Sequence, residues 1–163
     1  SGIGGLLLAS DGSCLGFFSE SVSKELVESI KRPDQKTVIF ELEGLAVAIG
    51  LSVFHSMLAG KRVVIFTDNQ AVQSCLIRCK SANLHMDYIV RYVCRQEERL
   101  STMAWIERVP SQSNPSDSLS REVVESLSDM KRTRVDLLTM WKNCLEEVRD
   151  VTLYTGEWRD DVG

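Results

Sequence analysis

Residues 62–69 read RVVIFTDN, and this short stretch decides the fold class of the chain. The run from Arg62 to Thr67 is continuous and of strand length, which is typical of a central strand covered on both faces. Asp68 follows it directly, and helical spacing begins at Gln70. Asp68 is therefore expected at the carboxyl end of a central strand, and ligands of open α/β sheets bind beyond such ends.

The segment before this strand predicts a long helix that continues to about Leu58. Its apolar residues recur at the spacing of one helix face. These residues are Ile39, Leu42, Leu45, Ala46, Ile49 and Val53.

The first part of the chain predicts a hairpin. Extended segments over 4–9 and 14–22 flank Asp11-Gly12, a pair that favours a tight turn between strands. A short helix is expected over 23–32, with Ser23 as its N-terminal cap.

Downstream of Asp68 the pattern predicts two helices, a returning strand over 103–109, a polar loop and a helix over 118–127. The resulting order is β-β-α-β-α-α-β-α, which predicts an α/β fold with a mixed sheet flanked by helices. We divide the chain into one domain over 1–127 and a helical C-terminal extension over 128–163.

Composition fits one globular domain, with 163 residues, 44% hydrophobic and 26% charged. The longest stretch without a charge, 44–60, is shorter than the roughly 20 apolar residues of a membrane span, so we expect no membrane partner. Five cysteines, an odd number, suit reduced thiols in the cytoplasm or nucleus. The net charge of −4 excludes a global basic field, although a local stripe of Lys and Arg is enough to hold phosphates.

Three acids are expected near one sheet edge: Asp68, Glu43 in the preceding helix and Asp117 in the loop after the last strand. Taken alone, Asp68 and Asp117 could cap the helices that follow them, and Glu43 could be a solvated side chain. Together they could hold a hard divalent cation such as Mg²⁺, which prefers oxygen ligands.

Three stretches carry E-x-x-A, T-D-N and N-x-x-D-x-x-S-R in that order. They are FELEGLAVAIGL over 40–51, VVIFTDNQAV over 63–72 and IERVPSQSNPSDSLSRE over 106–122. The set resembles the ribonuclease H domain attached to retroelement reverse transcriptases, most closely those of tyrosine-recombinase-type and related eukaryotic elements. The resemblance spans 2–122.

The resemblance implies a ribonuclease H-like fold and endonucleolytic cleavage of the RNA strand in RNA·DNA hybrids, with two Mg²⁺ or Mn²⁺ ions. It also implies an upstream reverse transcriptase domain in the same polyprotein as a partner. Carried over to this sequence, the catalytic and metal-holding carboxylates fall on Glu43, Asp68 and Asp117, with Glu41 as the alternative to Glu43. By analogy, Glu43 and Asp68 hold the ion that activates water, and Asp117 helps to hold the ion at the leaving oxygen.

The chain departs from this family at its start. Family members carry a further Asp in a first strand, shortly before a Gly-rich second strand. Here the chain opens with SGIGG and has no initiator Met, so we expect this strand upstream of Ser1 and little activity from the chain alone. A rival alignment places that Asp at Asp11, because 11–16, DGSCLG, looks like the corresponding segment of cellular type 1 ribonucleases H. We favour the hairpin turn for Asp11, since only one clear strand follows before the helix at Ser23.

Four basic residues follow Asp68 and could track the backbone of a hybrid, although scattered solubilising charge explains them equally well. They are Arg78, Lys80, Arg91 and Arg95. We assign His55 and His85 no catalytic role.

Two other functions stay open. A catalytically inactive module of the same fold could bind nucleic acid or brace an upstream polymerase domain, although a scaffold does not need carboxylates that repel one another. An enzyme of this fold could instead cut DNA, as integrase or exonuclease relatives do, but the N-x-x-D-x-x-S-R ending speaks against this.

Overall fold

The computed structural model describes residues 1–110 and 131–149. Its first two strands, β1 (Gly2–Leu8) and β2 (Cys14–Ser21), form the expected antiparallel hairpin, with Gly5 opposite Phe18. The turn contains Gly12 at φ 86°, a backbone conformation that glycine adopts at little cost.

Helix α1 (Lys24–Ile30) begins where the sequence predicts, because the Ser23 hydroxyl accepts a hydrogen bond from the Leu26 N–H. The long helix that follows differs from the prediction. It is divided into α2 (Ile39–Val53) and α3 (His55–Leu58).

The break lies at Phe54, whose backbone has φ −101° and ψ 16°. Phe54 is buried, and its ring packs beside that of Phe18 at a centroid distance of 6.2 Å. Packing of a large aromatic side chain against the hairpin accompanies the loss of regular helix geometry there, which helical spacing alone does not predict.

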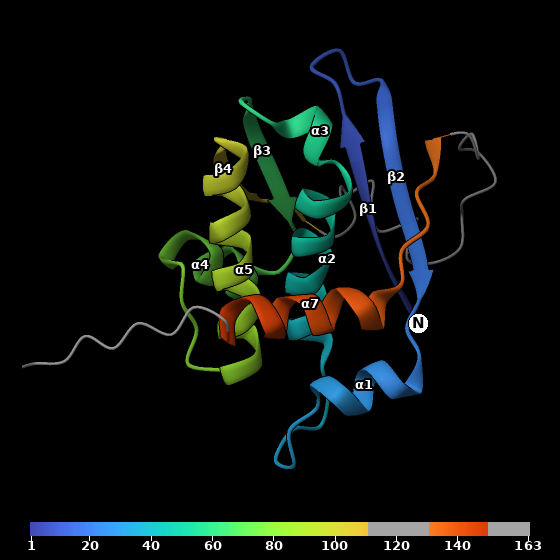
Figure 1. Cartoon of the computed structure of the whole chain (residues 1–163), viewed down its shortest axis with the longest axis vertical. Helices are drawn as coiled ribbons and strands as arrows, with labels where there is room; N and C mark the ends of the chain where they lie inside the picture. The colour runs from blue at the N-terminus through green and yellow to red at the C-terminus, as the bar shows by residue number, and fades with distance from the viewer. Residues whose placement is uncertain (111–130, 150–163) are drawn as a thin grey trace, which may run out of the picture.

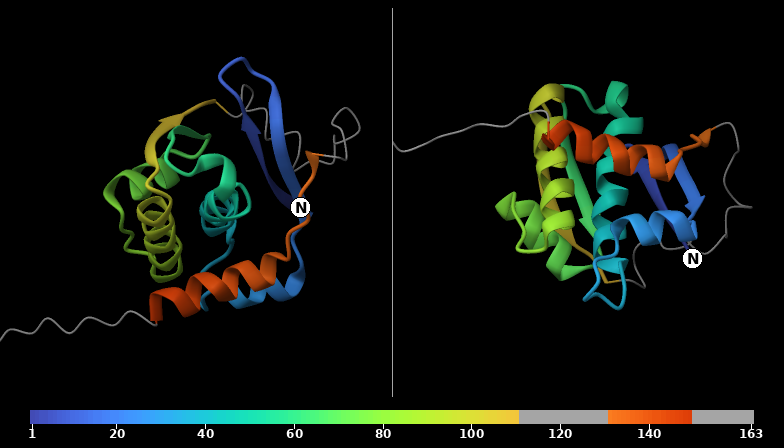
Figure 2. Two further views of the ribbon diagram at one scale, coloured as in Figure 1. Left: turned by 45° about the horizontal axis from the view of Figure 1, so that its top comes forward. Right: turned by 60° about the horizontal axis from the view of Figure 1, so that its bottom comes forward.

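The second half of the chain contains β3 (Arg62–Thr67), α4 (Gln70–Arg78), α5 (Leu84–Leu100) and β4 (Met103–Arg108). Strands β3 and β4 are parallel and in register from Arg62 opposite Met103 to Thr67 opposite Arg108. The described strands therefore form two separate sheets of two strands each. Figure 2 shows the hairpin and the β3–β4 pair on either side of α2.

The core lies between α2, α5 and the sheets. Helix α2 contacts α5 and β1, and its residue Gly44 allows the fully buried Met86 of α5 to approach closely. The core includes Phe18, Leu45, Ile49, Met86, Ile89 and Trp141. None of the described helices is long and apolar enough to cross a membrane.

Strand β3 is not covered on both faces, which corrects the expectation from its apolar run. Val63 and Ile65 pack against the core, but Val64 and Phe66 are 51% and 59% exposed. A run of apolar residues indicates a strand, but it does not show which element covers each face.

Residues 131–135 run along the outer edge of β2 before α7 (Leu137–Arg149) crosses the helices (Figure 1). The Thr133 N–H donates to the Phe17 carbonyl at 2.8 Å, and the Arg132 guanidinium donates to the Ser19 carbonyl. Helix α7 packs against α5 and α1 and buries Trp141. The predicted domain boundary between 127 and 128 lies outside the described residues.

Candidate active site

The site begins at the carboxyl end of β3, where Thr67, Asp68 and Asn69 link the strand to α4. The Thr67 hydroxyl is buried and accepts a hydrogen bond from the Asn69 N–H at 3.2 Å. The Asn69 side-chain oxygen accepts from the N–H groups of Ala71 and Val72 at 2.9 and 3.1 Å, which caps α4. Asp68 is thus held, half-buried, between two fixed residues.

Glu43 reaches this strand end from α2. Burial raises the pKa of the Glu43 carboxyl, the negative charge of Asp68 adds to the increase, and a hydrogen bond with the Asn69 side chain opposes it. These interactions place Glu43, Asp68 and Asn69 together. Asn69 is the member that the sequence prediction missed, and its place in T-D-N directly before a helix was the available signal.

Glu41, the alternative to Glu43, lies elsewhere. It is 1% exposed and accepts a hydrogen bond from the Gln35 side-chain nitrogen at 2.8 Å. Its position two residues from Glu43 puts it on a different face of α2. Of the two helix carboxylates, the structure brings Glu43 to Asp68.

The residues at this strand end fit a divalent cation. The Oε2 atom of Glu43 is buried and has no hydrogen-bond partner, and a second carboxylate, Asp68, lies close enough to raise its pKa. A buried carboxylate oxygen is costly unless a proton or a cation compensates it, and oxygen ligands suit Mg²⁺. The described residues contain no group of three such ligands, and Asp117 lies outside them.

Asp11 has the structural role that the turn interpretation gives it. Its carboxylate accepts hydrogen bonds from the N–H and the hydroxyl of Ser13, which lower its pKa. The loop that joins β1 and β2 lies at the α3 end of α2, whereas Glu43 lies within the first turns of α2 (Figure 1). Asp11 therefore belongs to the hairpin turn and lies away from the Glu43 carboxylate.

The four predicted substrate-binding residues fall into two pairs. Arg78 and Lys80 are exposed at the end of α4, and Arg91 and Arg95 lie one turn apart on α5. Arg91 donates to Asp87 at 2.7 Å, so part of its charge is already neutralised. The structure does not assign these residues to a ligand.

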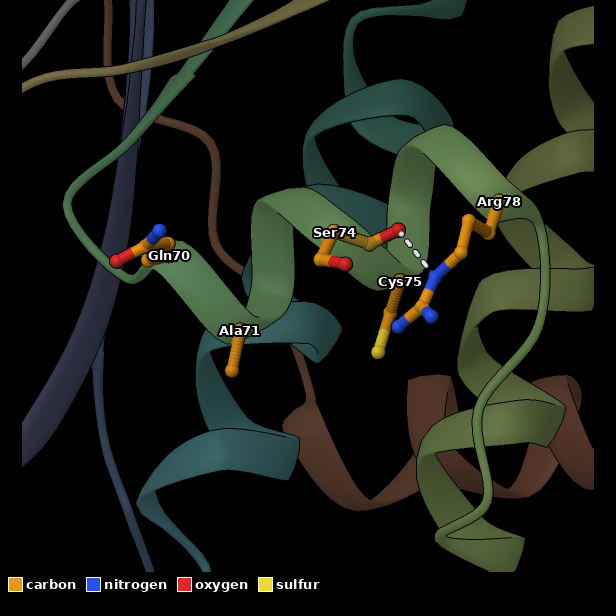
Figure 3. Close-up of a pocket in the computed structure, with 5 residues that line it drawn as sticks. All are labelled: Gln70, Ala71, Ser74, Cys75 and Arg78. Atoms are coloured by element: carbon orange, nitrogen blue, oxygen red, sulfur yellow. Dashed lines mark hydrogen bonds between the residues drawn. The ribbon is translucent and has the colours of Figure 1, made fainter.

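A depression of about 540 Å³ runs along α4 from Gln70 to Arg78 (Figure 3). The Arg78 Nε donates to the Ser74 carbonyl at 3.4 Å, and Cys75 forms part of the lining. The depression starts two residues after Asp68 and ends at a cationic side chain.

Both histidines have local structural partners. His55 Nδ1 lies 2.8 Å from the Ser52 carbonyl, and His85 Nδ1 contacts the Ile30 carbonyl. The His85 ring also meets Trp141 edge-on at 5.3 Å. These contacts explain the positions of both histidine side chains, and no catalytic role is needed to explain them.

Comparison with solved structures identifies a similar fold. The crystal structure of RNase H1 from the halophilic archaeon Halobacterium salinarum NRC-1 aligns with a TM-score of 0.53 and 19% sequence identity. The alignment covers 77% of this chain and 86% of that chain. No protein-family model matches the sequence, and no curated protein does either. The chain thus has the ribonuclease H-like α/β fold that the sequence resemblance implied.

Proposed function

We propose that this protein is a ribonuclease H that hydrolyses the RNA strand of RNA·DNA hybrids during reverse transcription of a retroelement. One observation carries the proposal. In a ribonuclease H-like fold, the partly buried Glu43 carboxylate, with an unpartnered oxygen, lies beside Asp68 at the carboxyl end of a strand. This arrangement is costly for stability and useful for cation binding.

Glu43, Asp68 and Asp117 are the proposed ligands of two Mg²⁺ or Mn²⁺ ions. When bound, such ions supply an activated water and neutralise the charge on the leaving oxygen. The protein's own residues fix the donors: Asn69 bonds to Glu43, and Thr67 holds the backbone of Asn69. The negative charge of Asp68, which adds to the increase in the Glu43 pKa, becomes a favourable neighbour when a cation lies between the two carboxylates.

The proposed substrate contacts lie along α4 and α5. A hybrid backbone that leaves Asp68 along the α4 depression would meet Ser74 and then Arg78. Lys80 after α4, and Arg91 and Arg95 on α5, would add positive charge, with recognition by helix shape and 2′-hydroxyls rather than sequence. Asp87 is paired with Arg91, so part of the Arg91 charge is already neutralised.

The proposed context is a longer polyprotein in the cytoplasm or nucleus, with a reverse transcriptase domain upstream. A first strand with one further carboxylate would precede Ser1. The chain 1–163 alone would then have an incomplete set of carboxylates and show little or no cleavage.

The test is cleavage of a labelled RNA·DNA hybrid in Mg²⁺ by the chain extended upstream with about 20 residues of its natural sequence, enough for one strand and a turn. Chain 1–163 and the extended Asp117→Asn variant are tested in the same assay. The extended Glu43→Gln and Glu41→Gln variants form a matched pair, because both lose one carboxylate from the same helix. The proposal is supported if the extended wild type and the extended Glu41→Gln variant cleave the hybrid and the other three proteins do not.

Two results would contradict the proposed reaction, and a third would contradict the proposed place of the further carboxylate. A folded extended protein that leaves the hybrid intact would favour the catalytically inactive module. Cleavage of duplex DNA but not of the hybrid would favour the DNA-cutting alternative. Efficient cleavage by chain 1–163 that Asp11→Asn abolishes would instead place the further carboxylate at Asp11.

A further inference from the structure

Two cysteines come together where α4 packs against α5. Cys79 follows directly after α4 and is exposed, whereas Cys94 lies within α5 and is half-buried. The two helices are in contact, and the segment after Arg78 runs back alongside α5 towards the start of that helix (Figures 1 and 3). The end of α4 therefore lies beside a later turn of α5, and Cys94 belongs to such a turn.

The two thiols are hydrogen-bonded to each other. Burial raises the pKa of the Cys94 thiol, and the hydrogen bond with the Cys79 side chain adds to the increase. Negative charge on Cys79, and on Glu97 and Glu98 of the same helix, raises it further. The Cys79 thiol in turn donates to the Leu76 carbonyl at 3.6 Å. The Cys94 sulfur is therefore a protonated thiol in contact with the Cys79 sulfur.

The backbone conformation at Cys79 is unusual for a residue with a side chain. Cys79 has φ 55° and ψ 33°, the left-handed conformation that ends α4, and its N–H donates to the Cys75 carbonyl. Glycine or asparagine usually fills this position, because a Cβ atom is disfavoured there. Glycine would end the helix at lower cost, but it would not place a thiol beside α5.

The other three cysteines have different surroundings. Cys75 and Cys144 are buried, and Cys14 is half-buried in the hairpin, where its thiol donates to the Gly16 carbonyl. All five cysteines lie in the described residues, and Cys79 is the exposed one among them. A reagent in solution therefore meets the Cys79 thiol first.

We propose that Cys79 and Cys94 form a reversible oxidation site, at which a hydroperoxide converts the two thiols into one disulfide. Cysteines that sense oxidants are typically exposed and lie next to a second, resolving cysteine. Arg78 and Lys80, on either side of Cys79, are exposed cations, and such surroundings are typical of reactive cysteines. Neither thiol is a proposed metal ligand, so this oxidation does not depend on the proposed function.

The reaction has two steps. The Cys79 thiolate attacks one oxygen of the hydroperoxide, the O–O bond breaks, and the departing oxygen takes up the proton that Cys79 has lost. The Cys94 sulfur then attacks the sulfur of the Cys79 sulfenic acid, so that the S–S bond forms and the S–O bond breaks. The hydroxyl group leaves as water with the proton of Cys94. Two electrons pass from the sulfurs to the hydroperoxide, which is reduced to an alcohol or water.

Peptide mapping of chain 1–163 tests the site. The reduced protein is treated with hydrogen peroxide, alkylated at its remaining thiols and digested with trypsin. Trypsin cuts between the two cysteines, so the disulfide joins two separate peptides, 79–80 and 92–95. We expect this linked pair as the main disulfide product and its disappearance after treatment with a thiol reductant. The urea-unfolded chain should instead give a mixture of linkages, because the contact between α4 and α5 is absent.

Three variants separate the roles of the two thiols. Cys94→Ser should stop at the Cys79 sulfenic acid, which a 1,3-diketone reagent traps. Cys79→Ser should slow the loss of thiols to peroxide by about 10-fold or more, because the remaining thiols are less accessible. Cys75→Ser is the matched control, one turn before Cys79 on the same helix, and should form the disulfide as wild type does. Circular dichroism checks that each reduced variant is folded, and the wild-type map needs no substitution.

Four results would overturn the proposal. Sulfinic acid at Cys79 with Cys94 still open to alkylation would show that the second thiol does not reach the first. A disulfide between two chains through Cys79 would show that its partner lies in another molecule. A main linkage through Cys14, Cys75 or Cys144 would place the reactive pair elsewhere. The same yield of the 79–94 linkage from the unfolded chain would show that the fold does not direct the pairing.

Discussion

The two glycines of α2 allow the packing of this helix to be measured. We predict that Gly50→Ala stabilises chain 1–163 and that Gly44→Ala does not. Both changes add one methyl group to the same helix and gain about 1 kcal/mol of helix propensity. They differ in surroundings, because a Cβ on Gly50 meets no atom within 4 Å, and one on Gly44 lies 2.6 Å from the Met86 thioether.

The clash at Gly44 determines the size of the difference. Met86 is fully buried, so its side chain can move only by displacing other core residues. Overpacking of this kind costs roughly 1–3 kcal/mol. Gly44→Ala should therefore change the free energy of unfolding by about 0 to −2 kcal/mol, against a gain of about 1 kcal/mol for Gly50→Ala.

Denaturant unfolding of the two variants beside wild type measures this difference, in which the helix propensities cancel. A gap near 2 kcal/mol corresponds to about 4–8 °C in melting temperature for a domain of this size. Equal stabilities of the two variants would refute the reasoning, because α2 would then not press against Met86. The contact matters for the site, since Gly44 directly follows Glu43.

Three further predictions concern the carboxylates and their neighbours. Asn69→Ala should lower the free energy of unfolding by about 1 kcal/mol through loss of the α4 cap, and an NMR titration should find the Glu43 pKa raised further. Glu41→Ala should lower the free energy of unfolding, measured with denaturant, by about 1–3 kcal/mol, because it leaves the Gln35 amide without its partner. The extended chain with this change should still cleave the hybrid at a temperature where it is folded. Burial raises the Glu97 pKa, so its charged form disfavours folding; Glu97→Gln should stabilise the chain at pH 7, and this gain should vanish as the pH falls below the ordinary carboxyl range.

Sequence patterns of a few residues were sufficient to predict the features that depend only on interactions between neighbouring residues. The Asp11-Gly12 turn, the Ser23 cap and the strand that ends at Asp68 were all predicted, because turn, cap and strand preferences act between near neighbours. The E-x-x-A motif of the resemblance placed Glu43 at the site, with Glu41 as the alternative, and the structure brings Glu43 to Asp68.

Features that depend on distant packing were not predicted. The helix break at Phe54 accompanies a contact with Phe18 from the hairpin, which helical spacing cannot reveal. The exposure of Val64 and Phe66 depends on what covers β3, and an apolar run carries no information on this. Asn69 was overlooked because its link to Glu43 joins two elements that are distant in sequence. The role of Asp117 stays a prediction.

The contacts along the outer edge of β2 have a consequence for synthesis. Arg132 bonds to Ser19, 113 positions earlier in the chain, and Lys131 bonds to Cys14, 117 positions earlier. During translation the hairpin therefore leaves the ribosome long before the residues that protect its edge are made. Contacts of such long sequence separation slow folding, and an unprotected strand edge can pair with another chain in the meantime. Nascent chains stopped before residue 131 should therefore be the form most prone to aggregation and most dependent on chaperones.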